Sequence, residues 1–456
     1  MRRKDVGVID HGNRGAARLG RVLAAVSILG VQLTAHAQGP ATPAPPPSGL
    51  RDVFVISLAV SPVYARTGTV VAIGASSHCE KTCYGVWVTH DGGHSWLRTF
   101  ESSHVPAQVA IAVDSRGHEV FYGGSTKRTY RSDDGGHTWN QIGSGGIATV
   151  LPSYAKEGKV IVAEDSGPAD YLLHESTPDT IEGSSGSFQD VDFGVAPQFP
   201  NGGRYSPALL AGIDPTTRYP VVLRCDANFV CAHPTRLNVT VSDNIPGSFS
   251  DPTLLSLSDD FIHDGVVFAD TPRGLFKSTD GGASFTAMRI APLTPGSQGL
   301  ATPAFALAPG YREAGPIRTA YAGVAQLSSG QNSLTVSGGI YSTTDGGATW
   351  APLATSAPLS GGAVALAVAP DGRLFAGYRD ADSGEVGLVC SADGGHTWLA
   401  SCPATGGHLI PDTVPIAAQS PTTGTGTLSY WIGGLALLLA STLGGLALRR
   451  RRSSRG

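Results

Sequence analysis

Charged residues are scarce in this chain of 456 residues: Asp, Glu, Lys and Arg make up 15% of it, against roughly 25% in an average domain. The sequence has no Gly-x-Ser-x-Gly, no His-Glu-x-x-His and no phosphate-binding glycine loop, the motifs of serine hydrolases, zinc proteases and nucleotide-binding proteins. Neither the cysteine spacing nor the neighbouring histidines suit a zinc site. The sequence therefore predicts no catalytic residue of these classes, no metal and no cofactor.

The two ends of the chain carry features that predict export and membrane anchoring. Residues 1–37 combine basic residues, an apolar run over residues 22–33 and a small-x-small site at Ala35-His36-Ala37, which predicts a signal peptide cut before Gln38. The alternative is a retained N-terminal anchor. Residues 428–448 form an uncharged run of 21 residues, the length of a transmembrane helix.

Four arginines directly follow this apolar run, so residues 449–456 are expected to be a basic cytoplasmic tail. The alternative is a sorting signal that is later removed, although no Leu-Pro-x-Thr-Gly motif precedes the run. The two ends predict an exported chain, anchored in a membrane by its C-terminal helix, with the bulk outside the cytoplasm.

The charge of the exported part is strongly negative. Setting aside six basic and two acidic residues in 1–37, and five basic residues in 449–456, leaves 21 basic against 34 acidic residues, a net charge of −13. Such a surface repels phosphate backbones, so we expect no nucleic-acid partner.

Six cysteines all fall in this exported part, in three close pairs: Cys79 with Cys83, Cys225 with Cys231, and Cys390 with Cys402. An even number of cysteines in an exported chain predicts disulfides. Three local bridges are the simplest assignment, although the sequence alone does not fix the connectivity.

Glycine is abundant, with 60 residues, and much of it belongs to a repeated turn. Five copies of Ser/Thr-x-Asp-Gly-Gly-x-Ser/Thr-aromatic occur, at Thr89–Trp96, Ser132–Trp139, Ser278–Phe285, Thr343–Trp350 and Ser391–Trp398. The Asp can accept backbone hydrogen bonds in its own loop, the glycines allow a tight hairpin, and the aromatic ring is expected to fill the space between neighbouring sheets. The predicted structural pairs are Asp91 with Trp96, Asp134 with Trp139, Asp280 with Phe285, Asp345 with Trp350, and Asp393 with Trp398.

A second repeat, an aromatic residue followed four positions later by Gly, precedes most of these turns. It occurs at Tyr64/Gly68, Tyr154/Gly158, Phe199/Gly203, Phe261/Gly265 and Tyr311/Gly315, and two shorter glycine turns end at Gly117 and Gly372. Seven units result. In unit five the expected strands are residues 253–257, 265–270, 274–278 and 284–288.

Two of the seven units lack the Asp turn. Unit three keeps only a remnant at Ser185–Phe188, and in unit four Cys225 and Cys231 flank the place of the turn, where a disulfide would close the hairpin. Units of about fifty residues with four short strands are typical of propeller blades. The sequence thus predicts an all-β fold, a seven-bladed β-propeller with four-stranded antiparallel blades over residues 51–402. Linkers are expected at 38–50 and 403–427, and His408–Ala417 is suggested as a ring-closing strand.

The five turns resemble the Asp-box, or BNR, repeats of the sialidase-like propeller superfamily, which includes sialidases, xyloglucan-cleaving glycosidases, sortilin-type receptors, the photosystem II assembly factor and bacterial surface proteins. This resemblance implies that the Asp boxes lie on the face away from any catalytic site and are structural. The adjacent His94, His137 and His396 are then exposed turn residues. The Phe-Arg-Ile-Pro signature of sialidases is absent, and Met288–Ala291 resembles it only in the wrong blade.

Loops on the opposite face are expected to carry any ligand. Those joining second and third strands offer Glu164, Asp165, Arg379, Asp380 and Asp382, although ordinary polar loops would look the same. Two functions follow: a non-enzymatic binding or scaffolding module at the cell surface for an unidentified protein or glycan, or a glycoside hydrolase acting on extracellular glycans. The sequence favours the first and leaves enzymatic activity open.

Overall fold

The computed structural model describes most of the region between Gly49 and Cys402. The described residues are 49–76, 84–102, 106–125, 128–143, 146–163, 171–174, 178–181, 189–201, 203–214, 217, 219–237, 254–271, 274–290, 297–329, 334–354 and 358–402. They all belong to one of the chain's two compact units, residues 48–456.

Several predictions fall outside these residues. They are the signal peptide, the transmembrane helix, the basic tail, the linker at 403–427, nearly all of the linker at 38–50, and the disulfide between Cys79 and Cys83. Within the described ranges, no helix has the length and hydrophobicity needed to cross a membrane.

The described strands form seven antiparallel sheets, and in each sheet every strand pairs with the next one along the chain. We call the sheets blades, numbered along the chain, and blade 1 consists of β1 (Val53–Val60), β2 (Val70–Ser76), β3 (Tyr84–Thr89) and β4 (Leu97–Ser102). Blade 2 consists of β5 (Pro106–Val113), β6 (Glu119–Ser125), β7 (Arg128–Ser132) and β8 (Asn140–Gly143). Blade 3 consists of β9 (Gly146–Val150), β10 (Val160–Ala163), β11 (Tyr171–His174) and β12 (Pro178–Ile181).

Blades 4 to 7 continue the same order. Blade 4 consists of β13 (Gln189–Val195), β14 (Ala208–Ile213), β15 (Pro220–Cys225) and β16 (Cys231–Arg236), and blade 5 of β17 (Leu254–Leu257), β18 (Val267–Thr271), β19 (Gly274–Ser278) and β20 (Thr286–Ala287). Blade 6 consists of β21 (Ser297–Leu307), β22 (Ala320–Ser329), β23 (Leu334–Thr343) and β24 (Ala351–Ala354). Blade 7 consists of β25 (Ala363–Val368), β26 (Leu374–Arg379) and β27 (Val386–Ser391). Three single-turn helices lie between first and second strands: α1 (Tyr64–Thr67), α2 (Tyr154–Glu157) and α3 (Phe261–Asp264).

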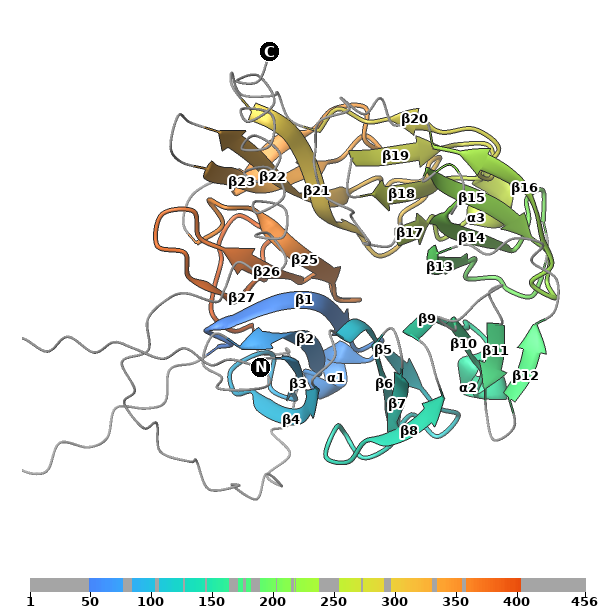
Figure 1. Cartoon of the computed structure of the whole chain (residues 1–456), viewed down its shortest axis with the longest axis horizontal. Coiled ribbons are helices and arrows are strands. Elements are labelled where there is room, and N and C mark those ends of the chain that lie inside the picture. Colours follow the sequence, from blue (N-terminus) through green and yellow to red (C-terminus); the bar gives the residue numbers. More distant parts are fainter. Residues whose placement is uncertain are drawn as a thin grey trace, which may run out of the picture. The chain divides into compact units, whose positions relative to one another are not determined.

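The sheets form a closed ring within this unit. The first strand of each sheet contacts the first strand of the next, from β1 to β5 and onward to β25, and β25 in turn contacts β1 (Figure 1). Radial sheets joined in this way define a β-propeller, so the predicted all-β propeller fold is confirmed.

The prediction of seven four-stranded blades needs a correction, because six of the described sheets have four strands and the seventh, β25–β27, has three. Two short segments lie along the outer edge of β27 instead of a continuous fourth strand. Leu399 forms an isolated bridge with Cys390, and Arg51 forms another with Gly387. The second bridge is flanked by hydrogen bonds from the Leu388 amide to the Leu50 carbonyl, 2.9 Å, and from the Asp52 amide to the Val386 carbonyl, 3.0 Å.

Ring closure therefore uses residues from both ends of the described region. The N-terminal segment Leu50–Asp52 and the C-terminal residue Leu399 share one edge of the last sheet. The suggested closing strand at His408–Ala417 lies outside the described residues. No sequence pattern indicated the N-terminal segment, since three residues are too few for a periodic pattern.

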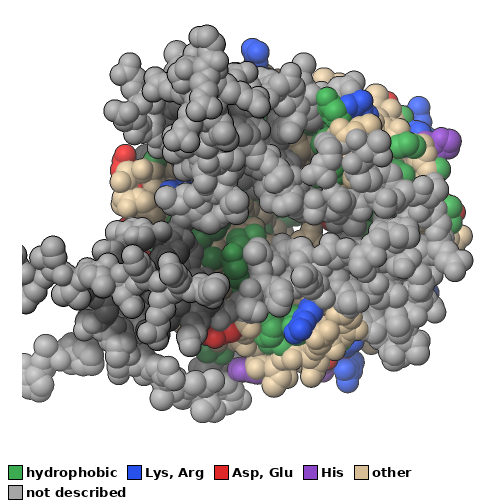
Figure 2. Space-filling model, in the orientation of Figure 1, with side chains coloured by type: hydrophobic (Ala, Val, Ile, Leu, Met, Phe, Trp, Pro, Cys, Tyr) green, Lys and Arg blue, Asp and Glu red, His purple; other side chains and the backbone are tan. Residues whose placement is uncertain are grey.

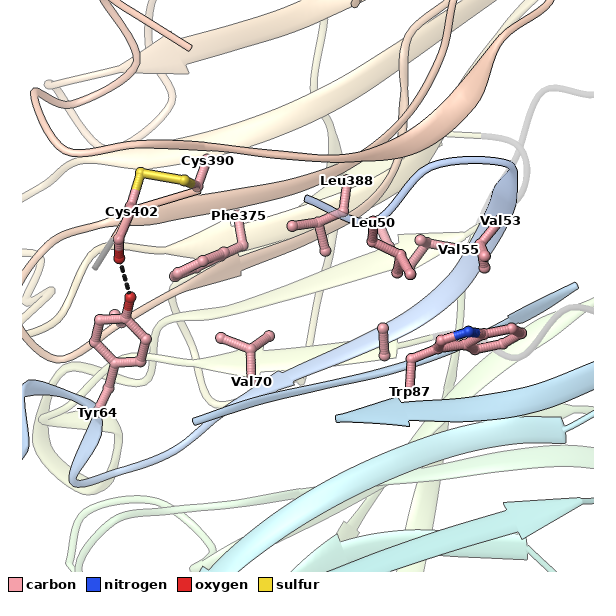
Figure 3. Packing of buried hydrophobic residues seen from close by; sticks show 13 residues of the cluster. Leu50, Val53, Val55, Tyr64, Val70, Trp87, Phe375, Leu388, Cys390 and Cys402 are labelled. Carbon is pink, nitrogen blue, oxygen red and sulfur yellow. Dashed lines mark hydrogen bonds between the residues drawn. A yellow bond between two sulfur atoms is a disulfide. The ribbon is translucent and has the colours of Figure 1, made fainter. Parts of the chain in front are cut away.

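The hydrophobic core lies between the blades rather than inside any one of them. Most buried apolar residues of the described part fall into seven clusters, each combining residues of two adjacent blades. At the junction of blades 7 and 1, Tyr64, Val70 and Trp87 face Phe375 and Leu388 (Figure 3). Each fully buried side chain of this size contributes about 1.5–3 kcal/mol, and every contribution depends on a neighbouring blade.

Candidate functional site

The five Asp boxes share one hydrogen-bond pattern. In blade 6, Asp345 Oδ1 accepts the Thr349 amide at 2.9 Å and the Thr343 hydroxyl at 2.7 Å, and Oδ2 accepts the Thr349 hydroxyl at 2.5 Å. The Thr343 hydroxyl oxygen accepts the Gly347 amide at 2.9 Å. Asp91, Asp134, Asp280 and Asp393 make the equivalent bonds in their own turns. Each carboxylate is therefore engaged within its own loop.

These bonds stabilise the ionised form of the box carboxylates. The hydrogen bonds from Thr349 and Thr343 hold the pKa of Asp345 well below its usual range, and those from Thr397 and Ser391 do the same for the pKa of Asp393. For Asp91, burial raises the pKa, but the bonds from Ser95 outweigh this effect and the pKa stays lowered. A group committed in this way has little capacity left for a substrate.

The aromatic residue of each box packs between its own blade and the preceding one. Trp96 lies against the cluster of blades 7 and 1, Trp139 against that of blades 1 and 2, and Phe285 against that of blades 4 and 5. Trp350 and Trp398 occupy the same place in blades 6 and 7. Trp96 and Trp139 also donate their indole N–H to a carbonyl of their own turn, Gly93 at 3.1 Å and Gly136 at 3.0 Å.

In blades 1 and 5, the aromatic–Gly repeat forms the turn beside the Asp box. In α1, the Gly68 amide bonds the Tyr64 carbonyl at 2.7 Å, and Gly68 has the left-handed φ of 63° that ends the helix. The Gly68 carbonyl then accepts the Gly92 amide of the box at 2.9 Å. This bond places the two kinds of turn on one face, which we call the box face.

The role of the repeated aromatic residue was missed at the sequence level. Its ring packs into the preceding blade: Tyr64 lies edge-on to Phe375 with centroids 5.4 Å apart, and Tyr311 lies edge-on to Phe268 at 5.7 Å. The Tyr64 hydroxyl donates to the Cys402 carbonyl at 2.5 Å. The fixed spacing to glycine was a signal for the turn, but not for the direction of the ring.

Two of the three predicted disulfides are present, and both reinforce turns of this face. Cys225–Cys231 joins β15 to β16 where unit four has no Asp box. In that turn Asp226 accepts the amides of Asn228 and Val230, both at 2.9 Å, so it holds the loop much as a box Asp does.

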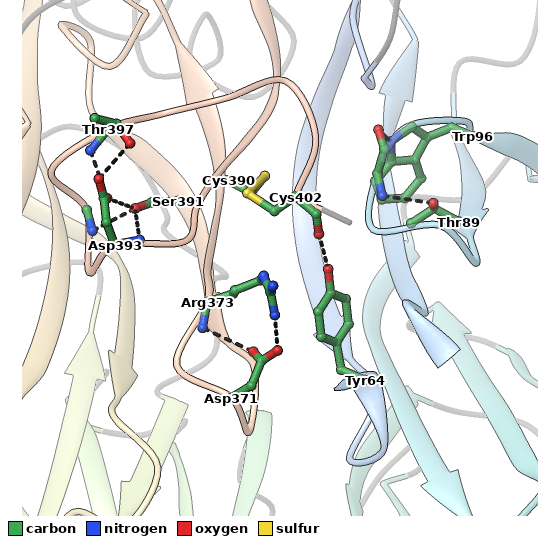
Figure 4. The surroundings of a disulfide bond; sticks show 12 residues. Tyr64, Thr89, Trp96, Asp371, Arg373, Cys390, Ser391, Asp393, Thr397 and Cys402 are labelled. Atoms are coloured by element: carbon green, nitrogen blue, oxygen red, sulfur yellow. Dashed lines mark hydrogen bonds and ion pairs between the residues drawn. A yellow bond between two sulfur atoms is a disulfide. The ribbon is translucent and has the colours of Figure 1, made fainter. Parts of the chain in front are cut away.

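The second disulfide, Cys390–Cys402, lies at the junction of blades 7 and 1, next to Tyr64 and to the ion pair of Asp371 with Arg373 (Figure 4). The third bridge, between Cys79 and Cys83, stays a prediction. Neither Cys79 nor Cys83 belongs to the described residues, which resume at Tyr84 with the start of β3.

On the opposite face, the predicted ligand residues of blade 7 lie on one loop. Arg379 is half-buried at the end of β26, and Asp382 is exposed. Asp380 is only 5% exposed, and its Oδ1 accepts the amides of Asp382 at 2.9 Å and Ser383 at 2.8 Å. These bonds, with that of Ser383 foremost, lower the pKa of Asp380. We therefore reassign Asp380 from ligand contact to loop support. Glu164 and Asp165 lie outside the described residues.

One further carboxylate lies inside the ring. The seven first strands carry only two charged residues, Asp190 and Asp192, both on β13. Asp192 is 6% exposed, and its Oδ2 accepts the Leu255 amide of blade 5 at 2.8 Å. Burial raises the pKa of Asp192 to about 6, against hydrogen bonds from Leu255 and from Gln108 of blade 2 that lower it. In the space-filling view, hydrophobic side chains are visible in the recess near the middle of the ring (Figure 2).

Within the ranges that the structure describes, no group of three His, Cys, Asp or Glu side chains could hold a metal ion. No protein-family model and no curated protein matches the chain in sequence.

Several solved structures are similar in shape. They include a mitotic checkpoint complex, at 12% identity over 80% of this chain and 98% of that one, TM-score 0.41. Also similar are a GH74 xyloglucanase from Xanthomonas campestris, at 14% identity over 75% of this chain and 57% of that one, TM-score 0.34, and a puromycin hydrolase, at 11% identity over 76% and 52%, TM-score 0.43.

Proposed function

We propose that this chain is an exported Asp-box propeller of seven blades, held at a membrane by its C-terminal segment, that acts as a non-enzymatic binding or scaffolding module. The seventh blade is the three-stranded sheet together with the two short segments at its edge, around Arg51 and Leu399. Two disulfides, Cys225–Cys231 and Cys390–Cys402, support export, because such bonds persist in oxidising compartments.

The observation that carries the proposal is the contrast between the two faces. Five nearly identical turns, each with its carboxylate engaged in its own loop, build the box face. The segments of sequence that join second to third strands, or one blade to the next, differ widely in length, from residues 126–127 between β6 and β7 to residues 237–253 between β16 and β17. Variable loops on a rigid frame are typical of a surface that binds a partner.

Binding and catalysis can be separated in one assay. The purified full chain would be incubated with immobilised xyloglucan, sialoglycoprotein and extracellular-matrix protein, and both retention and released sugar would be measured. We expect retention on at least one ligand without release of sugar above the protein-free control. Release of sugar from xyloglucan or a sialoside would contradict the proposal and favour a glycoside hydrolase.

The site on blade 7 is tested by a double variant, Arg379→Ala with Asp382→Ala. Neither side chain belongs to the apolar clusters of this blade, so we expect weaker retention with an unchanged melting temperature. Asp393→Ala, on the box face, is the matched control and should bind normally at a temperature where it stays folded. Unchanged retention by the double variant would exclude this loop as the site.

Export itself is tested on intact cells. Protease added outside the cells should digest residues 51–402 while a cytoplasmic marker stays intact. A chain that is degraded only after the cells are lysed would contradict the proposed localisation.

A further inference from the structure

In three Asp boxes, the carbonyl oxygen of the first glycine is in hydrogen-bond contact with the preceding blade. At the junction of blades 7 and 1, the Gly92 carbonyl accepts the Cys402 amide at 2.8 Å. At the junction of blades 5 and 6, the Gly346 carbonyl accepts the Lys277 ammonium at 2.8 Å. At the junction of blades 1 and 2, the partner of the Gly135 carbonyl is His90 Nε2, at 3.1 Å. An amide and an ammonium group carry hydrogen throughout the physiological pH range, whereas an imidazole nitrogen carries it conditionally.

The other ring nitrogen of His90 belongs to a chain of hydrogen bonds. His90 Nδ1 lies 3.0 Å from the Thr69 hydroxyl, which lies 2.8 Å from Glu119 Oε2. Glu119 Oε1 accepts the Thr67 hydroxyl at 2.7 Å. Thr67, Thr69 and His90 come from blade 1 and Glu119 from blade 2, so most links of this chain cross the junction.

The hydrogen atoms available to this hydrogen-bond network can be counted. A carbonyl oxygen only accepts, so His90 Nε2 must carry a hydrogen to bond Gly135. Thr69 has a single hydroxyl hydrogen, which cannot serve both neighbours. If it points to Glu119, then His90 Nδ1 must donate and the ring is charged. If it points to His90, the ring is neutral and Glu119 must be protonated to donate to Thr69.

Both arrangements hold one proton more than an ionised glutamate beside a neutral histidine. Without that proton, one of the short contacts joins two acceptors and has to open. We propose that the hydrogen-bonded network of Glu119, Thr69 and His90 takes up a single proton. This proton stabilises the junction of blades 1 and 2, so the stability of the junction depends on pH.

The direction in which stability changes with pH follows from the linkage between proton binding and folding. Only the folded chain assembles the network, and all of its bonds form only while the extra proton is present. The stabilisation is therefore present at acid pH and is lost as the pH rises through the range in which the network releases its proton.

Other charged groups near this junction are already engaged with partners of their own. Asp91 and Asp134 are bonded within their boxes, Asp133 pairs with Arg131, and Asp114 pairs with Arg116 and His118. Arg66 of α1 donates to the Gly117 carbonyl at 2.8 Å. The cationic Arg66 opposes proton uptake, and the box carboxylates favour it.

Two variants make the junction independent of the extra proton: one keeps every bond of the network at all pH values, and the other lacks the link to Gly135 at all pH values. In Glu119→Gln, the amide can donate to Thr69, whose hydroxyl then donates to a neutral His90, so every bond forms without an extra proton. In His90→Ala, the link to Gly135 is absent at every pH. His396→Ala is the control, because His396 is an exposed box histidine of blade 7, remote from this network.

The test is the melting temperature of the full chain from about pH 5 to about pH 8, the range in which imidazole side chains change charge. We expect wild type to match Glu119→Gln at the acid end and His90→Ala at the alkaline end, a swing of about 1–3 °C between the two variants. The His396→Ala profile should follow wild type. If the wild-type melting temperature changes with pH in parallel with that of either variant, the proposal is overturned. Because each variant gives this comparison by itself, one variant that folds is enough for the test.

Discussion

At the scale of single residues, the box aspartates act as fixed acceptors. Asp345 takes three hydrogen bonds from Thr343 and Thr349, and charge-assisted bonds of this kind are the strong ones. We predict that Asp345→Ala lowers the free energy of unfolding by about 1–3 kcal/mol. Urea denaturation measures this loss. Asp382→Ala, an exposed loop residue, is the control and should change little.

The lowered pKa of Asp345 also sets a pH dependence. Its folded-state pKa lies below its unfolded value of about 3.9, so its contribution is complete above that value and is lost as the pH falls through the folded pKa. Wild type and Asp345→Ala should therefore converge in stability below about pH 4. An undiminished difference in strong acid would show that charge plays no part.

The contribution of Asp192 to stability has the opposite pH dependence. Burial raises its folded pKa to about 6, so the folded chain binds a proton that the unfolded chain has released, and stability falls as the pH rises from about 4 to about 6. We predict that Asp192→Asn removes this fall and is more stable than wild type at pH 7 by about 3 kcal/mol, the free energy of a shift of this size. A less stable variant at pH 7 would mean that the ionised carboxylate serves the bonds to Leu255 and Gln108 better.

The sequence revealed some of these residues and hid others. The box aspartates stand in a repeated motif, so they could be named in advance. Asp192 lies on a strand with no repeat, and nothing in the sequence predicts that its side chain is buried. Glu119 and Thr69 become partners only across a blade junction, a contact between residues far apart in the chain.

At the scale of elements, the turn between first and second strands depends on glycine. A Cβ on Gly68 would lie 3.0 Å from the His90 carbonyl oxygen and 3.1 Å from the Gly92 nitrogen, and φ is 63°. Gly384 has a similar φ of 73°, but nothing lies within 4 Å of its Cβ position. We predict that Gly68→Ala destabilises by more than the cost of about 1 kcal/mol for the backbone alone.

Gly384→Ala isolates that backbone cost, and the comparison is made by thermal denaturation of both variants. Equal losses at the two positions would show that the close approach of α1 to the Asp box contributes nothing to stability.

Strand positions were well predicted where turns flank them. In blade 5, residues 274–278 were placed as observed, whereas the outer strand expected at 284–288 is only β20 (Thr286–Ala287). The difference has a physical reason: an outermost strand has one neighbour and little apolar area, so hydrophobic pattern constrains it weakly.

At the scale of the whole molecule, we expect unfolding to be cooperative, because every cluster is shared by two blades. The ring therefore depends on the junction where the first and last described segments share the edge of β27. The internal repeats predicted a ring, since no unit of this size can bury its apolar faces alone. They could not predict the closure, because the closing residues lie outside the repeats.

Hydrogen exchange at β27 tests the closure most directly. In the full chain, the Leu388 amide donates to the Leu50 carbonyl, so peptides covering residues 386–391 should exchange slowly. Deleting residues 49–52 should make them exchange faster, while strands of blade 5, on the far side of the ring, keep their protection. Unchanged protection of residues 386–391 after the deletion would contradict a ring closed by its N-terminal segment.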